Sequence, residues 1–164
     1  MKIQYSKPDR QDIPAILELF QSMKNEPHRS TFSDVNNGDQ ILNWLNQEDY
    51  NLYVARTDKK IIGVLRAYQE PDLQRHACLL TIAVSTAYRK QGIGKSLIIY
   101  GVADLKNKGI LVARALIFSD NKPSINTFLS AGFSITGSIL KHHFNHQSGH
   151  YVDDLILYKE LTHY

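Results

Sequence analysis

Residues 84–95, with the sequence Val-Ser-Thr-Ala-Tyr-Arg-Lys-Gln-Gly-Ile-Gly-Lys, decide most of the fold of this chain. An apolar run, Cys78 to Val84, ends where this stretch begins, and an amphipathic helical pattern over residues 93–105 starts at its end. The sequence therefore predicts a strand, a basic turn with two glycines, and a helix. Glycine lets the backbone approach a ligand closely, and the first N–H groups of a helix have no acceptor within it. Amide donors and the helix dipole favour phosphate, so we expect a phosphate-bearing ligand here.

Three phosphate-binding motifs compete for this turn. The Rossmann fingerprint needs a third glycine where the chain has Leu97, and a P-loop needs its first glycine where the chain has Arg89. Residues 94–96, Gly-Lys-Ser, match only the second half of a P-loop. The third motif, Arg-x-x-Gly-x-Gly after a strand, is satisfied by Arg89, Gly92 and Gly94. It resembles the pyrophosphate loop of the GNAT N-acetyltransferase superfamily, which binds acetyl-CoA.

A second motif covers residues 121–133 and follows another apolar run, residues 109–118. Asp120 or Asn121 is expected to cap a helix, Pro123 suits its first turn, and Gly132 is placed to end it in a left-handed conformation. The stretch resembles the Asn-x-x-[Ala/Ser]-x-x-x-[Tyr/Phe]-x-x-x-Gly-Phe element of the same superfamily. Residues 137–153 are similar to the branch that contains phosphinothricin-type and ribosomal-protein-type acetyltransferases.

Composition limits the classes of protein to consider. A chain of 164 residues with 43% hydrophobic and 21% charged residues is typical of one soluble domain, expected over residues 1–164. Its only cysteine, Cys78, excludes an internal disulfide and suits the cytoplasm. We see no signal peptide and no apolar segment of about 18 residues, so no membrane partner is expected. The net charge of +3 comes without a Lys/Arg stripe, which argues against nucleic acid.

Hydrophobic periodicity predicts an α/β (α+β) fold. The resemblance implies a GNAT-type mixed, mostly antiparallel seven-stranded sheet flanked by about four helices, with the fourth and fifth strands splayed apart around the cofactor. A polar loop is expected over residues 24–38. We expect strands at 2–7, 51–56, 61–68, 74–85, 110–118, 133–144 and 151–161, and helices at 9–23, around 41–45, 92–108 and 122–131.

The resemblance also implies how the cosubstrate acetyl-CoA is bound. The pantetheine arm pairs with the backbone of the fourth strand and contacts Asn121, the pyrophosphate lies on the amides of residues 89–95, and Phe128 lies near the thioester sulfur. Arg89, Lys90 and Lys95 add positive charge around the pyrophosphate. The expected cofactor-binding residues are Ile82, Ala83, Val84, Arg89, Lys90, Gln91, Gly92, Ile93, Gly94, Lys95, Ser96, Asn121, Ser124 and Phe128.

The implied reaction is direct transfer of the acetyl group to a primary amine, with backbone N–H groups near Ile82 stabilising the oxyanion. A base or a water chain must first remove a proton from the amine. Many family members use a glutamate where this chain has Cys78 and a tyrosine where it has Phe128. Because both are missing, catalytically weak or inactive CoA binding, as in a sensing module, is an alternative function. The candidate replacements are His76, Cys78, Thr81 and Tyr151, followed by Glu70 and Tyr158, although Cys78 also suits a buried strand position.

The acceptor is less well defined by the sequence. Arg66, Tyr68 and Glu70 alternate on one face of a strand, and this face often lines the acceptor site in the family. Tyr151 and Asp153 are further substrate-binding candidates, although a structural Asp153 bonded to nearby backbone is favoured. Trp44 and residues 24–38 lie where family members place a covering segment, although an anchoring core Trp44 is the default. We expect a small-molecule or peptide amine, with protein N-terminal or lysine acetylation and nucleotide-phosphate binding as alternatives, and a homodimer is possible.

Four histidines, His142, His143, His146 and His150, crowd one predicted hairpin. Strand alternation puts His142 and His146 on the same side, and zinc binds imidazole pairs. Asp153 or Asp154 could complete such a site, but a solvated polar hairpin is favoured. We therefore expect no metal.

Overall fold

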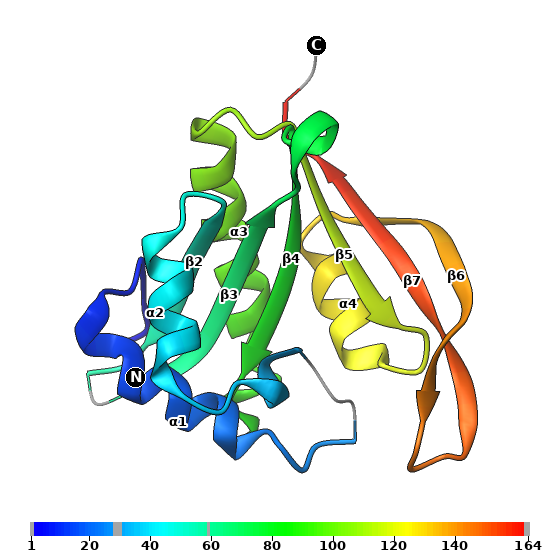
Figure 1. The fold of residues 1–164 in the computed structure, drawn as a ribbon, viewed down its shortest axis with the longest axis horizontal. Coiled ribbons are helices and arrows are strands. Elements are labelled where there is room, and N and C mark those ends of the chain that lie inside the picture. Colours follow the sequence, from blue (N-terminus) through cyan, green and yellow to red (C-terminus); the bar gives the residue numbers. More distant parts are fainter. Residues whose placement is uncertain (1, 28–30, 59, 163–164) are drawn as a thin grey trace.

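The computed structural model describes residues 2–27, 31–58 and 60–162, and Figure 1 shows a central sheet with helices on both faces. The elements follow the predicted order, with four short 3-10 helices added at loops. The α-helices are α1 (Ile13–Ser22), α2 (Gly38–Asn46), α3 (Ile93–Asn107) and α4 (Lys122–Ser130). The strands are β1 (Gln4–Ser6), β2 (Tyr50–Arg56), β3 (Ile61–Gln69), β4 (Ala77–Val84), β5 (Val112–Phe118), β6 (Ser134–Asn145) and β7 (His150–Glu160). The 3-10 helices are η1 (Arg10–Asp12), η2 (Thr31–Asp34), η3 (Asp72–Gln74) and η4 (Thr86–Tyr88).

The seven strands form one mixed sheet in the order β1-β2-β3-β4-β5-β7-β6. Only β4 and β5 run parallel, so the sheet is mostly antiparallel, as the resemblance implies. β4 pairs with β3 from Cys78 to Val84, but it pairs with β5 only over Ala77–Leu79. β5 pairs along its full length with β7 instead. The expected splay of the fourth and fifth strands is thereby confirmed, and Figure 1 shows the two strands diverging toward their C-terminal ends.

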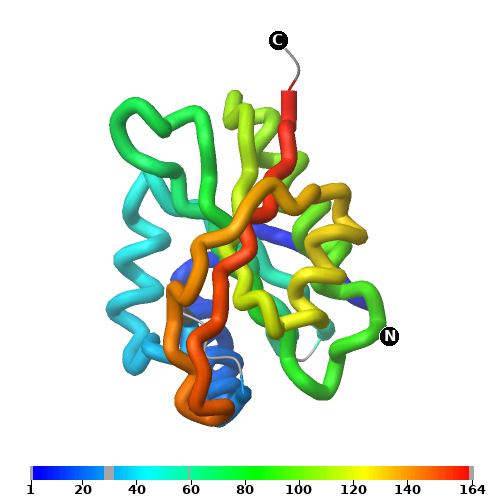
Figure 2. The backbone as a smooth tube through the Cα atoms, turned by 90° about the vertical axis from the view of Figure 1, so that its right-hand side faces the viewer, coloured from blue at the N-terminus to red at the C-terminus, as the bar shows by residue number. Residues whose placement is uncertain are grey.

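Two hydrophobic clusters lie on opposite faces of the sheet. In Figure 2, α2 (cyan) and α4 (yellow) lie on opposite sides of the sheet. α3 and α4 pack on the face that carries Leu65 and Ala67, and α1 and α2 pack on the face that carries Val64. Because α1 and α2 contact mainly β2 and β3, they leave β5 and β7 uncovered, and Leu116 is 41% exposed there. We call the sheet face opposite α3 and α4 the open face. By strand alternation, its residues on β3, β4, β5 and β7 include Arg66, Tyr68, Leu79, Thr81, Arg114, Leu116, Phe118, Asp154 and Tyr158.

Most helix and strand ends agree with the prediction, and the differences have local causes. The first helix begins at Ile13 because Asp9 and Asp12 form a capping box around η1. β4 begins at Ala77 because η3 occupies the preceding residues. The segment predicted as a loop over 24–38 contains η2, and its residues 28–30 lie outside the described ranges. Gly132 ends α4 with φ +91°, as predicted.

None of the helices in the described ranges has the length and apolar character needed to span a membrane.

Candidate functional site

The loop before α3 leaves a run of backbone donors free. Lys90 and Gly92 have φ values of +59° and +76°, and alternating left-handed residues turn successive N–H groups to one side, as in anion-binding nests. No side chain caps α3. The first bond into the helix is Ser96 N–H to Gly92 C=O, so the N–H groups of residues 90–95 have no acceptor within the described parts of the chain. This run lies at the positive end of the helix dipole, where an anion is favoured.

Gly94 allows the start of α3 to lie against β4 and α4. A Cβ atom at this position would lie 3.0 Å from Thr127 Cγ2 and 3.6 Å from Val84 Cγ2. The free N–H groups are therefore held beside Thr127 of α4 and the C-terminal end of β4. The sequence motif predicted the position of this loop because its glycines are required by the local backbone conformation.

The side chain of Arg89 does not add free positive charge to this loop, which corrects the prediction. Its Nε donates to the Val84 carbonyl at 2.9 Å, and its Nη2 donates to both carboxylate oxygens of Glu26 at 2.6 and 2.8 Å. Its backbone N–H donates to Thr86 C=O within η4. Thr86 Oγ1 also donates to Glu26 at 3.1 Å. Arg89 therefore fixes the turn, while Lys90 and Lys95 remain exposed beside the free amides.

The second set of free groups lies on β4. Beyond Leu79, the edge of β4 that faces β5 has no partner strand, and this edge includes Ile82, Ala83 and Val84. Across the opening, Asn121 caps α4 by accepting a hydrogen bond from Ser124 N–H at 3.3 Å. The amide nitrogen of Asn121 makes no hydrogen bond within the described part of the chain.

Phe128 lies in the core below this opening. It is 2% exposed and contacts Phe133 edge-on, with 5.1 Å between ring centroids. A phenylalanine here supplies packing and no hydroxyl group. The missing tyrosine noted in the sequence is therefore a missing proton donor in the structure as well.

Two of the catalytic candidates lie at the paired, closed end of β4 and not at the opening. Cys78 is fully buried in the α3-side core, and burial, with a smaller contribution from Glu70, raises the pKa of its thiol to about 12. His76 is exposed, and its carbonyl accepts the N–H groups of Leu111 and Val112. Strands rise about 3.3 Å per residue, so Cys78 lies about 20 Å from Val84. The structure therefore argues against both residues as the base.

The residues of β4 that face the open side are Leu79 and Thr81, because strand side chains alternate. Thr81 is the one polar side chain on the splayed part of β4, residues 80–84. Glu70 is engaged elsewhere, since its Oε2 accepts a hydrogen bond from Arg114 Nη1 at 2.6 Å. Tyr158 pairs with Arg114 in the sheet and is likewise at the closed end.

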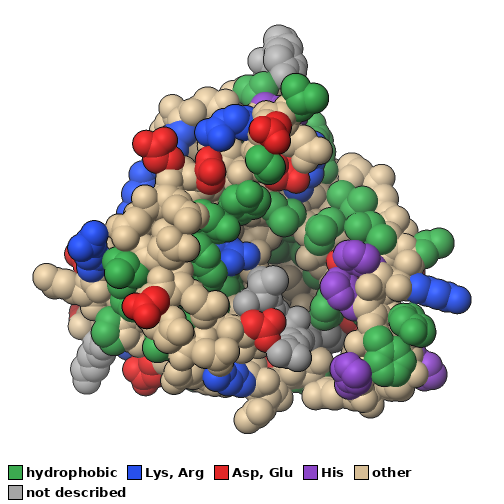
Figure 3. Space-filling model, viewed as in Figure 1, with side chains coloured by type: hydrophobic (Ala, Val, Ile, Leu, Met, Phe, Trp, Pro, Cys, Tyr) green, Lys and Arg blue, Asp and Glu red, His purple; other side chains and the backbone are tan. Residues whose placement is uncertain are grey.

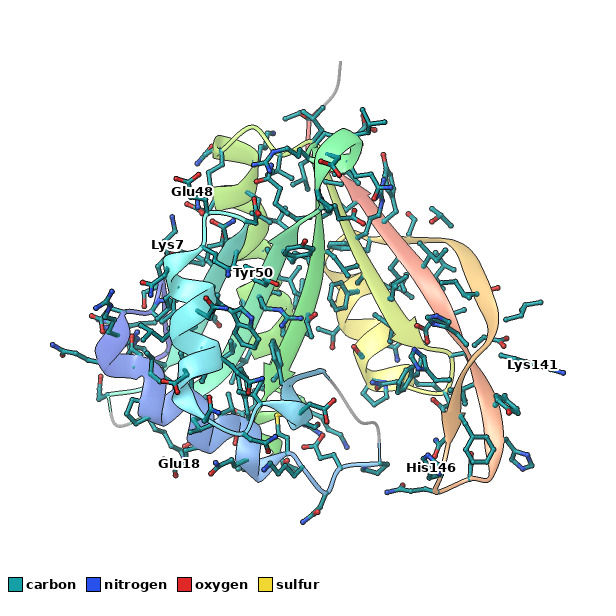
Figure 4. The ribbon with its side chains drawn as sticks, viewed as in Figure 1. Lys7, Glu18, Glu48, Tyr50, Lys141 and His146 are labelled. Carbon is teal, nitrogen blue, oxygen red and sulfur yellow. The ribbon has the colours of Figure 1, made fainter. Side chains whose placement is uncertain are left out.

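The C-terminal candidates also have structural roles. Asp153 Oδ1 accepts the N–H of Lys141 at 2.7 Å, which agrees with the structural interpretation favoured for this residue. Tyr151 is 63% exposed and contacts Phe144, 5.2 Å between ring centroids. In Figure 4, His146 lies at the end of the β6–β7 hairpin, and Lys141 points away from the sheet.

The expectation that His142 and His146 face the same side of the hairpin is wrong, because a bulge changes the alternation. Lys141 has φ +50°, and the β6–β7 register shifts between Ile139 and His143. As a result His142 Nδ1 and His143 Nε2 both lie near Asp154 Oδ2, at 2.8 and 3.2 Å, while His146 packs on Phe144 instead. No short-range signal in the sequence indicates this bulge.

The cluster of His142, His143 and Asp154 lies on the β6–β7 side of the molecule, where Figure 3 shows histidine side chains beside a central hollow. Asp154 is 3% exposed, and its Oδ1 has no hydrogen-bond partner among the described residues. The three donor atoms lie within 4.8 Å of one another and would suit a divalent metal. Two neutral imidazoles that each donate one N–H to the carboxylate account for the arrangement equally well, so the expectation of no metal stays a prediction.

Arg66 lies on the open face inside a group of aromatic rings. Its guanidinium carbon is 4.6 Å from the ring centroid of Trp44, 5.2 Å from that of Phe32 and 5.9 Å from that of Tyr50. Its Nη2 donates weakly to Thr81 Oγ1 at 3.5 Å, and its buried Nε has no partner among the described residues. Tyr68 contacts Tyr50 at 4.8 Å between centroids. Arg66 and Tyr68 therefore lie on one face of β3, as predicted, and Thr81 lies beside Arg66 on the neighbouring strand.

Two open surface cavities have volumes of about 400 and 320 Å³. One is lined by Tyr50, Gln69 and Lys108 among others, and the second by Lys24 and Asn36 among others. Neither contains the free amides or the unpaired edge of β4. We therefore base the candidate site on unsatisfied hydrogen-bonding groups and not on cavity volume.

Comparison with solved structures gives many matches to this fold. A ribosomal-protein-alanine N-acetyltransferase from Brucella melitensis has 21% identity and a TM-score of 0.85, covering 96% of this chain and 99% of that one. A phosphinothricin acetyltransferase from Sinorhizobium meliloti in complex with acetyl-CoA has 19% identity and a TM-score of 0.86, covering 98% and 89%. The protein smu.2055 from Streptococcus mutans has 27% identity and a TM-score of 0.83, covering 99% and 100%.

No curated protein sequence matches the chain. Residues 13–133, which include both sequence motifs, match the model of the acetyltransferase (GNAT) family. The match spans most of the chain and agrees with the splayed sheet and the glycine loop. The chain therefore belongs to the acetyltransferase (GNAT) family, and it is an acyltransferase of that family.

Proposed function

We propose that residues 1–164 form one acetyl-CoA-binding domain that transfers an acetyl group directly from the CoA thioester to a primary amine. The observation that carries this proposal is the pair of unsatisfied backbone surfaces at one end of the sheet. The N–H groups of residues 90–95 have no acceptor within the described ranges. The edge of β4 beyond Leu79 has no partner strand there, although the Val84 carbonyl at its end accepts a hydrogen bond from Arg89 Nε. Unpaired backbone groups are rare in folded proteins unless water or a ligand satisfies them.

The two surfaces fit different parts of acetyl-CoA. The amide run at the N-terminus of α3, with exposed Lys90 and Lys95, suits the pyrophosphate. The unpaired edge of β4 suits the amide groups of the pantetheine arm, because an extended chain can add to a sheet edge. On the opposite side of the opening, the amide oxygen of Asn121 accepts the N–H of Ser124, and its amide nitrogen has no partner among the described residues. We therefore assign Ile82, Ala83, Val84, Asn121 and residues 90–95 to cosubstrate binding.

When bound, acetyl-CoA supplies an activated acyl thioester. The contribution of the chain is to align the acceptor with it and to offer backbone N–H donors on β4 near Ile82 to the developing oxyanion. The splayed part of β4 carries a hydroxyl, Thr81, and no carboxylate, and Phe128 carries no hydroxyl. A threonine can relay a proton to water but does not retain it near neutral pH. We infer that water, relayed past Thr81, removes the proton from the amine.

Thermal-shift titration with acetyl-CoA, CoA, ATP and NAD in parallel tests the proposed function. A ligand at about 100 times its Kd stabilises the native state by about 2.7 kcal/mol, or roughly 5–10 °C for a domain of this size. We expect this shift with acetyl-CoA and CoA only, followed by amine-dependent release of free thiol. A shift with ATP alone would contradict the proposal. A shift with acetyl-CoA and no thiol release from any amine would favour the CoA-binding alternative.

A matched pair of lysine variants locates the pyrophosphate. Lys95 and Lys106 are both exposed on α3, the first at its N-terminal end and the second in its last turn. We expect Lys95→Ala to raise the Kd for CoA by about threefold to tenfold, with a weaker dependence on salt. Lys106→Ala should leave that Kd unchanged. Equal effects of the two variants would place the pyrophosphate elsewhere.

A further inference from the structure

Arg66 differs from Arg56, Arg89 and Arg114 in having no carboxylate partner among the described residues. Arg56 makes two bonds with Asp12, at 3.0 and 2.9 Å, and Arg114 bonds Glu70 at 2.6 Å. Arg89 bonds both oxygens of Glu26. No carboxylate of the described residues lies within ion-pair distance of Arg66, although burial is large enough to lower the pKa of its guanidinium. The group nevertheless remains charged, because arginine does not lose its proton in proteins.

The surroundings of Arg66 fix its position without satisfying its donors. The rings of Phe32, Trp44 and Tyr50 attract the cation through their π-electrons and exclude water, but they accept no ordinary hydrogen bond. A guanidinium has five N–H donors. Among the described residues one acceptor, Thr81 Oγ1, lies within reach, at the limiting distance of 3.5 Å. A desolvated charge in this state is costly unless something else supplies the counter-charge.

The position of Arg66 indicates that the acceptor substrate supplies the missing negative charge. Arg66 pairs in the sheet with Thr81, which lies on the splayed part of β4, and both side chains are on the open face. The free amides of residues 90–95 belong to α3, on the opposite face. α2 and η2 bring Trp44 and Phe32 over Arg66, so the covering segment and the charge form one surface beside the reaction centre.

Resting on the proposed function, we propose that the acceptor is a small primary amine that also carries a carboxylate, and that Arg66 binds this carboxylate. A single guanidinium matches one negative charge, and planar carboxylates pair with it through two parallel hydrogen bonds. A phosphate dianion would need more positive charge, and the next arginine on this face, Arg114, is already paired with Glu70. The aromatic rings around Arg66 suit an acceptor whose carbon skeleton is apolar.

Matched pairs of amines test this proposal directly. Each pair has the same skeleton with and without the charge: leucine and leucinamide, phenylalanine and phenylalaninamide, and the ω-amino acid γ-aminobutyrate with n-butylamine. The two kinds of amino acid differ in the distance between amine and carboxylate. The measured quantity is kcat/KM for thiol release, divided by the fraction of neutral amine at the assay pH, so that differences in amine pKa cancel. Product binding, with each N-acetylated compound added to the CoA-loaded protein, gives a readout that does not need turnover.

We expect wild-type protein to prefer the carboxylate member of at least one pair by about 10- to 100-fold, as for a hydrogen-bonded charge pair. Arg66→Met, which keeps the length of the side chain, should reduce this ratio to nearly one. The ratio is the readout, because any change in kcat/KM that is common to both members of a pair cancels in it. Arg66→Lys should restore part of the preference, because it keeps the charge but not the planar fork. Arg75→Met is the matched control, since Arg75 is exposed and pairs with Asp49.

Two outcomes would overturn the proposal. One is equal kcat/KM and equal product binding for charged and uncharged members in wild-type protein. The other is a carboxylate preference that survives in Arg66→Met. The thermal shift with acetyl-CoA, recorded on the same proteins, separates this failure from that of the proposed function. A normal shift with no carboxylate preference rejects only the role of Arg66, whereas a missing shift in wild-type protein rejects acetyl-CoA binding itself.

Discussion

The two ends of β4 differ in how completely their polar groups are paired. At the closed end, Cys78 and Leu79 have strand partners on both sides, and the charge of Arg114 is matched by Glu70. At the open end, one edge of β4 has no partner strand within the described chain. There the amides of residues 90–95 have no acceptor, and Arg66 has no carboxylate beside it. The polar groups of the sheet are thus paired within the protein at one end and left unpaired at the other.

This difference indicates that the open end of the sheet is the ligand-binding end. Pairing every polar group is the stable solution, and the closed end shows that this chain can achieve it. The open end leaves donors unpaired on both faces of the sheet, amides on the α3 side and a guanidinium on the open face. Each of the following predictions changes one end and uses the other for comparison.

Substitution of Gly94 should have the largest effect. In Gly94→Val, the Cβ atom would lie 3.0 Å from Thr127 Cγ2, and the two added methyl groups are expected to push α3 away from α4 and displace the free amides. We expect acetyl-CoA to bind at least about 100-fold more weakly by calorimetry, the loss of about 2.7 kcal/mol of anion-binding energy. Gly137→Val is the control, because a Cβ there would make an ordinary contact of 3.6 Å with Ile156. Binding by Gly94→Val within threefold of wild type would reject the loop as the pyrophosphate site.

Removing a paired or an unpaired arginine should have opposite consequences for stability in the absence of ligand. Arg114→Met leaves the half-buried Glu70 without its partner and should lower the free energy of unfolding by about 1–2 kcal/mol. Arg66→Met removes a desolvated charge that has no counter-charge, so the free energy of unfolding should change by less than about 0.5 kcal/mol or rise. Urea denaturation of the two variants measures the difference. A greater loss in Arg66→Met than in Arg114→Met would mean that Arg66 serves packing in the free protein.

The smallest effect concerns Cys78 and depends on pH. The native thiol, with its pKa raised to about 12 by burial, keeps its proton when an unfolded thiol with a pKa near 8.5 loses it. The unfolded state therefore binds fewer protons above about pH 8.5, and stability falls as pH rises, by up to about 1.4 kcal/mol per pH unit. Cys78→Ala has no thiol, so its free energy of unfolding lacks this dependence on pH. The difference in free energy of unfolding between wild type and variant should therefore narrow above pH 8.5 and stay constant below it. Rapid reaction of the native thiol with a disulfide reagent at pH 8 would contradict the assignment.

The features that could be predicted from sequence are those that depend on neighbours along the chain. The glycine loop before α3, the Asn121 cap and the left-handed Gly132 each follow from local backbone geometry, and each lies where it was expected. Alternation along β3 likewise placed Arg66 and Tyr68 on one face.

The features that could not be predicted depend on strand register and on distant partners. His76 and Cys78 were candidates because the predicted fourth strand, 74–85, includes them. β4 begins only at Ala77, and its pairing with β5 decides which part of it is open. The bulge at Lys141 turns His142 and His143 toward the carboxylate of Asp154, and no pattern in the neighbouring sequence predicts this bulge. Similarly, the partner of Arg89 is Glu26, 63 residues earlier in the chain.

The bond between Glu26 and Arg89 limits how the substrate specificity of this enzyme can be changed. Glu26 belongs to the segment that leads to η2 and Phe32, over the open face, yet it holds Arg89, which in turn holds the Val84 carbonyl at the end of β4. Covering segments are where evolution and protein engineers exchange loops to accept new substrates. In this chain a graft that replaces residue 26 would also release the turn before α3. A transplanted loop has to begin after Glu26 or bring an acidic residue of its own to that position.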